Sequence, residues 1–417
     1  MSALGQVASY TWVIKEDPKN RNILFLGTEK GLFTSLDRGA SWARFRPTGF
    51  PDVAVRDIVF QTRDDDMVLV THGHGIWIVD DISPLRNLDP ATLASDLKLI
   101  PSRPVEQRMR GNGGWTESDA MYAGQNLPAG AKISYYQRTR HVIGRMKVEV
   151  LDPNDALVDE LPASRRKGLN RISCSMQTKP PQVPPAASIA GSSTQGQRVM
   201  PGRYTVRITK NGVATTMPLD VTLDRRATDT LADRKAQFDA AERTKALFAG
   251  MSTLAARIAA AREGAEKIAD DKALPATTRA LAEKIAARGD VLRKEIAATT
   301  EGGAITGEER LREHTDTVYG AITGSEGAPT NYQLARIAAL ERELTDVEGE
   351  FAALQASDLK ALNGALQRRG KPVIDVAAVS FIPDHARGAL IEALASGLLG
   401  TRFLGIAATL KPAGERD

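Results

Sequence analysis

Two pairs of side chains in the first hundred residues could do chemistry. His72 and His74 lie two positions apart in the stretch THGHGIW, and Asp80 and Asp81 follow as neighbours. Residues i and i+2 of an extended strand point to the same face, so the two imidazoles could contact one metal ion. Zinc sites in proteins use three or four protein ligands, however, and the chain has only five histidines. We therefore expect a pair of turn residues and no bound metal.

Asp80 and Asp81 are the best carboxylate pair for glycoside hydrolysis, which needs two acids on opposite sides of the sugar bond. Adjacent residues of a strand point to opposite faces, so this pair would need a partner acid from another part of the protein. The sequence has no Gly-x-x-x-x-Gly-Lys-Ser/Thr phosphate loop, no Gly-x-Ser-x-Gly elbow and no His-Glu-x-x-His helix. We therefore predict no catalytic residue and no cofactor in this chain.

Two acidic clusters do not match the patterns of metal-binding sites. Residues 64–66, Asp-Asp-Asp, lack the ligand spacing of a calcium-binding loop, so we predict a solvated turn. Glu308, Glu309 and Glu313 lie in a helical pattern that lacks the Glu-x-x-His pairs of di-iron proteins. We predict that they form a solvated helix face.

The stretch SLDRGASW contains Ser35, Asp37, Gly39 and Trp42. An Asp followed two residues later by a Gly is typical of a turn, because the carboxylate accepts backbone N–H groups and the Gly adopts a positive φ. The apolar run LFLGTEKGLF precedes it. We therefore predict the corner of a β-hairpin with Trp42 packed beneath it, and a role for Asp37 in an active site is the alternative.

Composition restricts the class of protein. A chain of 417 residues predicts two or three domains, and 42% hydrophobic residues are enough to form their cores. A net charge of +4 and 5% aromatic residues argue against nucleic-acid binding. One cysteine excludes an internal disulfide and a thiolate metal cluster. The first twenty residues show no signal-peptide pattern.

An internal repeat organises the first part of the chain. The segment from Val13, VIKEDPKNRNILFLGTEKGLFTSLD, aligns without a gap with the segment from Asp57, DIVFQTRDDDMVLVTHGHGIWIVDD, at a spacing of 44 residues. Both copies read as strand, polar turn, strand, glycine-containing turn, strand. Periods of this length with several short strands are typical of β-propeller blades.

SLDRGASW matches the Ser-x-Asp-x-Gly-x-x-Trp pattern of the Asp box, and the surrounding sequence resembles the closing blades of bacterial sortilin-type (BNR-repeat) propellers. The resemblance implies that Ser35, Asp37, Gly39 and Trp42 form a structural hairpin at the edge of a blade, distant from any catalytic centre. It also implies a periplasmic or secreted location. Residues 1–87 would then be about two blades of a propeller that needs four to eight. We expect that the remaining blades were lost or are encoded upstream; the alternative is a dimer mate that covers the faces and edges of these two.

The middle of the chain predicts an antiparallel β-sandwich of the immunoglobulin or fibronectin type over residues 96–225. Short alternating runs such as AKISYYQRT and GRYTVRITKNG indicate its strands, with Tyr204, Val206 and Ile208 on one face and a turn at Asn211-Gly212. A similar sandwich follows the propeller in the resembled family, where Trp-Asp usually stands in place of Cys174-Ser175. The Pro-, Ser- and Gly-rich residues 179–197 predict a disordered loop.

Residues 228–370 predict an antiparallel helical bundle, and the segment from Asn331 should be its longest helix. The first helix should bury a stripe of Phe238, Leu247, Met251, Leu254 and Ile258, and end at Asp271–Pro275. Residues 377–417 do not fit the resembled family. Glu392 and Arg402 argue against a membrane span there, so we expect a docked or disordered amphipathic tail, with a frame-shifted end as another explanation.

The fold class predicted is therefore multidomain β plus α. The function that this organisation favours is a non-catalytic, extracytoplasmic module that binds a protein or a glycan. The alternative is a fragment of a propeller glycoside hydrolase whose catalytic acids lie in upstream blades. Asp boxes alone do not distinguish the two, because sialidases share them and a fold does not establish a function.

Overall fold

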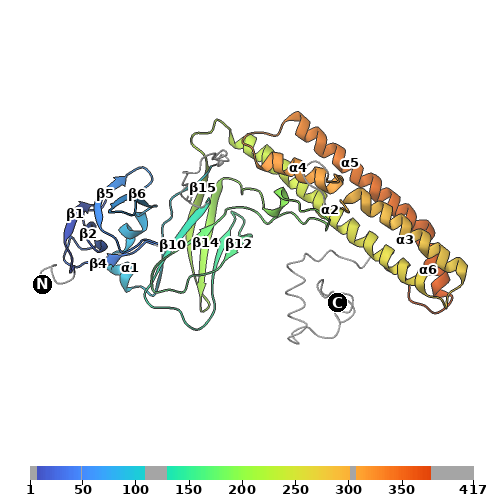
Figure 1. Ribbon diagram of the computed structural model, residues 1–417, viewed down its shortest axis with the longest axis horizontal. Helices are drawn as coiled ribbons and strands as arrows, with labels where there is room; N and C mark the ends of the chain where they lie inside the picture. Colours follow the sequence, from blue (N-terminus) through green and yellow to red (C-terminus); the bar gives the residue numbers. More distant parts are fainter. Residues whose placement is uncertain (1–6, 48, 109–128, 301–306, 377–417) are drawn as a thin grey trace. The chain divides into compact units, whose positions relative to one another are not determined.

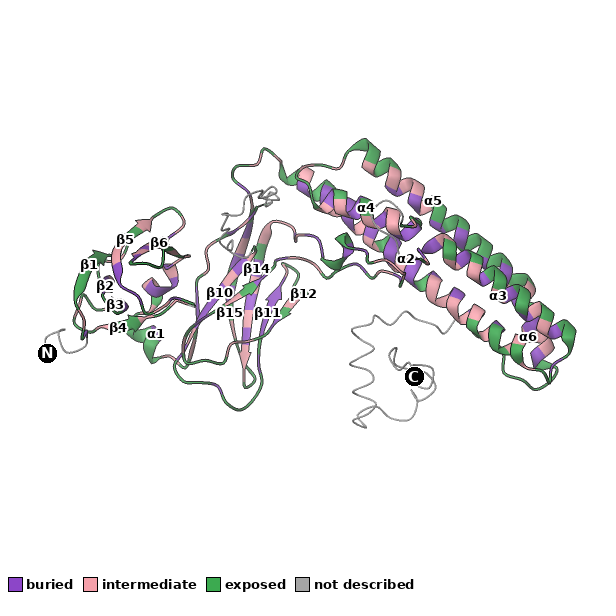
Figure 2. Ribbon diagram, viewed as in Figure 1, coloured by how far each residue is buried: buried purple, intermediate pink, exposed green. Residues whose placement is uncertain are grey.

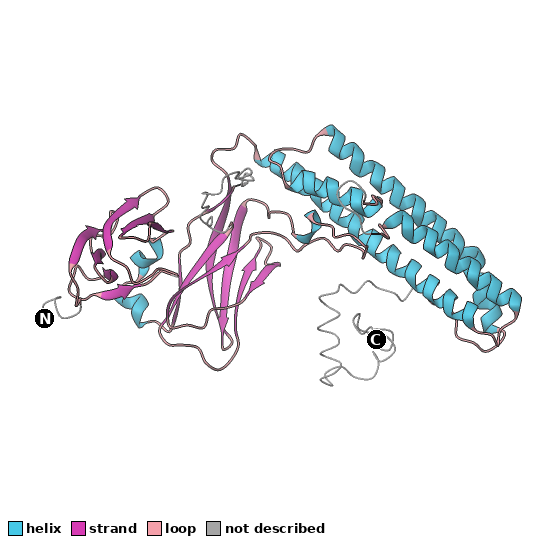
Figure 3. Ribbon diagram, viewed as in Figure 1, coloured by secondary structure: helices cyan, strands magenta, loops and turns pink. Residues whose placement is uncertain are grey.

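The computed structural model describes residues 7–47, 49–108, 129–300 and 307–376 (Figure 1). The chain mixes β-sheets and α-helices, as predicted, with the described strands before residue 224 and the long helices after residue 230 (Figure 3). It divides into two compact units: residues 1–178 with 198–228, and residues 179–197 with 229–417. The predicted tail at 377–417 lies outside the described residues. None of the described helices has the length and apolar character needed to cross a bilayer.

The first part of the β-rich unit consists of two small antiparallel sheets. One contains β1 (Thr11–Glu16), β2 (Leu24–Thr28), β3 (Gly31–Ser35) and β4 (Ala43–Phe45), in that order. The other contains β5 (Val55–Gln61), β6 (Asp66–Thr71) and β7 (Ile76–Val79). The two sheets share one apolar core, to which Phe25, Leu32, Ile58 and Leu69 contribute.

The 44-residue repeat is visible in the backbone. The pairing of β1 with β2 shifts register between Thr11 and Val13, and the pairing of β5 with β6 shifts between the equivalent Val55 and Asp57. Thr28 Oγ1 donates to Gly31 O at 2.8 Å across the β2–β3 turn, and Thr71 Oγ1 donates to Gly75 O at 2.7 Å across the β6–β7 turn. The β6–β7 turn is one residue longer than the β2–β3 turn, and the gapless alignment of the two repeats does not show this difference.

Gly27 in β2 has a steric cause. A Cβ there would lie 2.6 Å from Val55 O and 2.7 Å from Val13 Cγ1, so no larger residue fits without a shift of the neighbouring strand. The glycine thus permits the close approach of the two sheets at this point.

The rest of the β-rich unit has two larger sheets. The three-stranded sheet has the order β13-β10-β8, and the five-stranded sheet the order β12-β11-β14-β15-β9. Neighbouring strands are antiparallel except for β15 and β9, which are parallel. Their bounds are β8 Leu97–Ile100, β9 Val105–Gln107, β10 Ala131–Gln137, β11 Met146–Leu151, β12 Leu157–Leu161, β13 Gly168–Cys174, β14 Gly202–Lys210 and β15 Val213–Leu223. Helix α1 (Pro90–Ala94) and the 3₁₀ turn Ser83–Asn87 precede them.

Both sheets contribute to a single apolar core. Tyr204, Val206 and Ile208 are buried together, as predicted from their alternation. Figure 2 shows buried positions, in purple, along the strands of these sheets. Asn211 and Gly212 have φ angles of 51° and 83°, which form the predicted tight hairpin turn between β14 and β15. Cys174 is also buried in this core, and burial raises the pKa of its thiol to about 11.

The helical unit contains α2 (Leu231–Asp270), α3 (Ala276–Ile296), α4 (Leu311–Thr323), α5 (Asn331–Leu354) and α6 (Lys360–Gln367). Helix α5 begins at Asn331, as predicted, and Thr330 caps it through a reciprocal pair of hydrogen bonds with Gln333. Helix α2 ends at the predicted break, and with 40 residues it is longer than the whole helical run that begins at Asn331. The expectation that the segment from Asn331 is the longest helix is therefore wrong. A π-helical turn at Gln355–Leu359 divides that segment into α5 and α6.

The α2 stripe enters a common helical core with one exception. Leu247, Met251, Leu254 and Ile258 are buried there. Phe238 is only half-buried, and the Arg234 guanidinium lies 5.7 Å from the centre of its ring.

The expectation of a disordered loop at residues 179–197 is wrong. This segment belongs to the helical unit, and Val183 and Ala186 pack against its core. Arg312 Nε donates to Pro184 O at 2.9 Å, and Ser252 Oγ donates to Gln182 O at 2.7 Å. Proline-rich composition does not distinguish a free loop from a segment fixed by side-chain donors.

Candidate functional site

The SLDRGASW turn is held together by its own side chains. Ser35 Oγ donates to Asp37 Oδ1 at 2.7 Å and accepts from Gly39 N at 2.8 Å. Ser41 binds Asp37 twice, through its N–H at 2.8 Å and its hydroxyl at 2.5 Å. Arg38 and Gly39 have φ angles of 59° and 90°, and Trp42 lies half-buried beside Gly39. Every hydrogen bond that these contacts give the Asp37 carboxylate is internal to the turn.

This arrangement gives Asp37 a structural role. Hydrogen bonds from the Ser41 hydroxyl and backbone, followed by the Ser35 hydroxyl, hold the pKa of Asp37 below its ordinary value. The carboxylate therefore stays ionised and bonded near neutral pH, where it cannot act as a proton donor.

We predict that Asp37→Ala lowers the free energy of unfolding by about 1 kcal/mol, the usual cost of losing a turn-fixing hydrogen bond. Ligand binding should be unchanged, because the carboxylate serves only its own turn. Thermal melting and a ligand pull-down of the variant test this. Unchanged melting with abolished binding would show that Asp37 belongs to a site.

His72 and His74 lie in the turn between β6 and β7 rather than in a strand, so the alternation that would place them on one face does not apply. Both are exposed, and Gly73 and Gly75 beside them have positive φ angles. Their backbones have structural partners: His72 N donates to Ala54 O at 3.0 Å, and Trp77 Nε1 donates to His74 O at 2.9 Å. Among the described residues, no three His, Cys, Asp or Glu side chains gather as a metal site.

Asp80 and Asp81 anchor the chain where it leaves β7. Arg171 Nη1 donates to Asp80 O at 2.9 Å and Nη2 to Asp81 O at 2.5 Å. The Asp81 carboxylate accepts from Ser83 N and Oγ at 3.2 and 2.5 Å. Asp66 Oδ1 in turn accepts from Asp81 N at 2.9 Å. The carboxylate of Asp81 is thus occupied by a turn, as that of Asp37 is.

Asp66 is a candidate acid that sequence reasoning did not single out. Its burial, and secondarily the negative charges of Asp80 and Asp64, raise the pKa of its carboxyl. A raised pKa is what a general acid requires. Asp66 therefore joins Asp81 as a residue to test against the hydrolase alternative.

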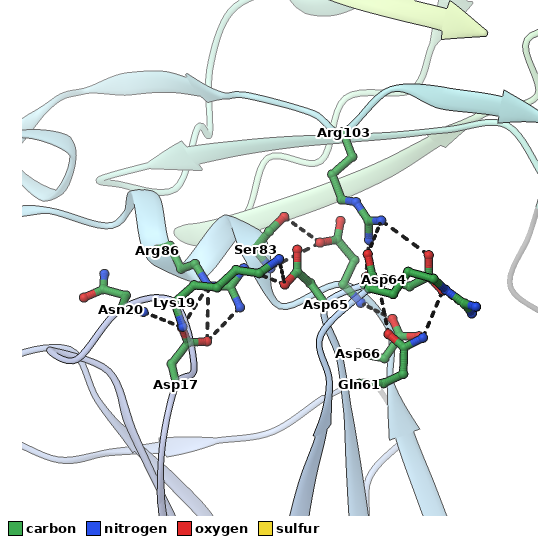
Figure 4. A network of polar contacts seen from close by, with 12 residues as sticks. Asp17, Lys19, Asn20, Gln61, Asp64, Asp65, Asp66, Ser83, Arg86 and Arg103 are labelled. Carbon is green, nitrogen blue, oxygen red and sulfur yellow. Dashed lines mark hydrogen bonds and ion pairs between the residues drawn. The ribbon is translucent and has the colours of Figure 1, made fainter. Parts of the chain in front are cut away.

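A polar network connects the turns of the two repeats (Figure 4). Arg86, in the 3₁₀ turn after β7, donates to Asp17 Oδ2 at 2.8 Å through Nη2 and pairs with Asp65 Oδ1 at 2.8 Å through Nη1. Lys19 Nζ lies 2.7 Å from the same Asp65 oxygen. The side chains of Asp17, Asp65 and Arg86 are 1%, 8% and 14% exposed.

The turn at residues 64–66 is therefore not the solvated turn expected from its sequence. Burial alone would raise the pKa of Asp65, but its contacts with Lys19 and Arg86 outweigh burial and lower it. Burial alone would lower the pKa of Arg86, but its contacts with the carboxylates of Asp17 and Asp65 outweigh burial and raise it. Arg103 holds the other side of this turn, where Nη2 donates to Arg63 O at 3.1 Å. The network is a structural clamp with balanced charges, and the sequence offers no spacing that would reveal it.

An aromatic pocket opens at β1, an edge strand of the first sheet. Tyr10, Thr11, Trp12, Glu29 and Arg56 line a cavity of about 560 Å³. Trp12 Nε1 donates to Glu29 Oε2 at 2.7 Å, and the Arg56 guanidinium lies 3.5 Å from the centre of the Trp12 ring. Tyr10 is 83% exposed and Trp12 50% exposed. We call these five residues the β1 pocket.

No protein-family model matches the chain, and a search of curated proteins found no match either. The assignment to sortilin-type repeats therefore depends on the Asp-box turn and the 44-residue repeat, and we carry it forward as a proposal.

Proposed function

We propose that this chain is a non-catalytic binding module of a periplasmic or secreted protein. In this proposal its small sheets are blades of a sortilin-type propeller, its larger sheets are an immunoglobulin-like sandwich, and its helices are a bundle. The ligand is a protein or a glycan. The β1 pocket is the observation that carries the proposal.

The chemistry of the β1 pocket suits recognition. Exposed aromatic rings provide apolar area at a low cost in side-chain entropy, and a neighbouring arginine and glutamate provide directional hydrogen bonds. The contacts of Trp12 with Glu29 and Arg56 hold its ring in one orientation. Such fixed orientation favours binding, because less freedom is lost when a ligand arrives.

Four carboxylates in the turns of the small sheets support the same conclusion. Asp37 and Asp81 hold turns, and Asp17 and Asp65 neutralise Arg86. Glycosidases need two carboxyl groups free to face the sugar from opposite sides. These four groups are instead occupied within the fold.

We predict that Trp12→Ala and Tyr10→Ala each weaken ligand binding about tenfold or more, as loss of a central aromatic contact usually does. Binding to a glycan array and to an extracytoplasmic protein fraction measures this. The control is Tyr332→Ala, which removes a tyrosine that is 77% exposed in the helical unit. Equal loss in the control would show that the β1 pocket has no special role.

The hydrolase alternative has its own test. We expect the purified chain to release no product from a panel of aryl glycosides. Turnover that disappears in Asp66→Asn or in Asp81→Asn, while folding is retained, would replace the proposal by a glycoside hydrolase with its acid in these sheets.

A further inference from the structure

Two loops of the larger sheets gather positive charge around an open cavity. The loop between β10 and β11 contributes Arg140, and the loop between β12 and β13 contributes Ser164, Arg165, Arg166 and Lys167. Together they line a cavity of about 570 Å³, and the four basic residues are exposed. We call these five residues the basic cavity.

No acid among the described residues forms a salt bridge with the charges of the basic cavity, which are those of Arg140, Arg165, Arg166 and Lys167. Asp96 approaches the β10–β11 loop, because Arg138 N donates to Asp96 O at 3.2 Å. Its carboxylate is already paired with Lys210 at 2.8 Å, however. Four unpaired cations around one cavity repel one another unless an anion lies between them.

Side chains beneath the β12–β13 loop fix the backbone that carries Arg165 and Arg166. The buried Tyr135 hydroxyl donates to Ser164 O at 2.5 Å, and Gln137 Nε2 donates to Arg165 O at 3.1 Å. Asn170 Nδ2 donates to Arg166 O at 2.9 Å. Three successive carbonyl groups are thus bound by buried side chains, so the loop is rigid while its side chains reach the surface. Rigid presentation of charge lowers the entropic cost of binding.

We propose that the basic cavity binds an anionic polysaccharide that carries sulfate or carboxylate groups. Guanidinium groups match these groups through paired, charge-assisted hydrogen bonds, and three of the four cations here are arginines. The lining has no aromatic side chain on which a nucleobase could stack, which disfavours single-stranded nucleic acid. The proposal rests on the proposed binding function and adds a second surface, distinct in its residues from the β1 pocket.

An anionic membrane is the competing occupant. Val142 and Ile143 in the same β10–β11 loop are 71% and 84% exposed. Two aliphatic side chains provide little apolar area, and stable attachment to a membrane requires more than one such weak contribution. The observations therefore favour a polysaccharide, and vesicle binding serves as the contrary outcome of the test.

The test uses the whole chain and heparin as the probe. We expect retention on immobilised heparin, and affinity for soluble heparin about 10- to 100-fold lower in the combined variant Arg140→Ser, Arg165→Ser and Arg166→Ser. The slope of log affinity against log salt should also fall by about two, because fewer counterions are released. These side chains are exposed, so the melting temperature should not change. The single variant Arg140→Ser should give a smaller loss.

The matched control removes the same charge from the helical unit: Lys267→Ser, Lys272→Ser and Arg342→Ser, all at exposed positions. Heparin affinity should not change in this control or in Trp12→Ala. Absence of heparin binding, or an equal loss in the control, would overturn the proposal. So would binding to phosphatidylserine vesicles that Val142→Ser and Ile143→Ser abolish while heparin is not retained. Turnover of an aryl glycoside would contradict only the proposed function, since the heparin result does not depend on it.

Discussion

Replacing Arg86 with glutamine should lower the free energy of unfolding of the β-rich unit by about 3 to 5 kcal/mol. Arg86 balances Asp17 and Asp65, whose side chains are 1% and 8% exposed. Without the guanidinium, two buried carboxylates would lose the cation that they share, and Lys19 would remain as the only described cation paired with Asp65. Removing one partner from a buried charge network costs much more than breaking an exposed pair, because the remaining charge has lost its water. Urea unfolding followed by the near-ultraviolet signal of the tryptophans measures the change.

A matched exposed pair provides the control. Arg203 and Asp220 form a salt bridge at 2.9 Å with side chains that are 72% and 45% exposed. Arg203→Gln should leave the stability nearly unchanged, because water already solvates both groups. Equal effects of the two substitutions would mean that the Arg86 network is solvated like any surface pair.

Because of the same network, the stability of the β-rich unit should depend on pH in the acidic range. The pKa of Asp65 in the folded protein is lower than its ordinary value of 3.8, so the unfolded chain takes up a proton first as pH falls. The contribution of Asp65 to stability is therefore present above that value and is lost as pH falls through the lower folded pKa. Arg86→Gln should flatten this part of the stability curve, because it removes one of the two cations that lower the pKa of Asp65.

The second large effect should come from Arg312 in α4, whose substitution by leucine should lower the free energy of unfolding of the helical unit by about 3 kcal/mol. Its side chain is 6% exposed and donates to Pro184 O and Ser188 O, both at 2.9 Å. The leucine would leave two backbone carbonyls of the 179–197 segment without their donor, and it would leave Glu313 without the Arg312 guanidinium. Unfolding of the whole chain in urea, followed by the far-ultraviolet helical signal, measures the change.

Limited proteolysis measures the effect of Arg312→Leu on the 179–197 segment itself. In the unmodified protein the 179–197 segment should resist a non-specific protease, since Ser193 also binds Asp316 Oδ1 through its N–H at 2.8 Å and its hydroxyl at 2.6 Å. Arg312→Leu should make it a site of early cleavage. The control Arg342→Leu, at an exposed position of α5, should neither lower the free energy of unfolding nor expose the 179–197 segment to early cleavage. Rapid cleavage of the unmodified segment would mean that its contacts with the helices are transient.

Local structure followed from the sequence wherever its cause lies within a few residues. The turn at SLDRGASW, the hairpin at Asn211-Gly212 and the start of α5 at Thr330 all depend on hydrogen bonds or φ preferences between near neighbours. Spacing along the chain encodes such interactions directly. The 44-residue repeat also predicted two similar sets of strands, and these share a β-bulge at equivalent positions.

The predictions that failed concern groups that are distant in sequence. Residues 64–66 looked like a solvated turn because the acids stand together, but the partner of Asp65 is Arg86, which also binds Asp17 from 69 residues away. Residues 179–197 looked disordered because their composition favours neither helix nor strand, yet they bind Arg312 more than 120 positions later. In both cases the partner is an ordinary charged residue whose neighbours along the chain do not mark it.

The sequence by itself thus determined local features such as the SLDRGASW turn, the Asn211-Gly212 hairpin and the alternation of buried residues in β14, because these depend on local periodicity and short-range hydrogen bonds. Only the tertiary structure decided which charges are paired and which are left free. It uses Asp37, Asp81 and Asp65 within the fold, fixes the 179–197 segment against the helices, and leaves Arg140, Arg165 and Arg166 without an ion-pair partner among the described residues. The physical reason is that the energy of a charge depends on its burial and on the groups within a few ångströms, and long-range chain packing determines both.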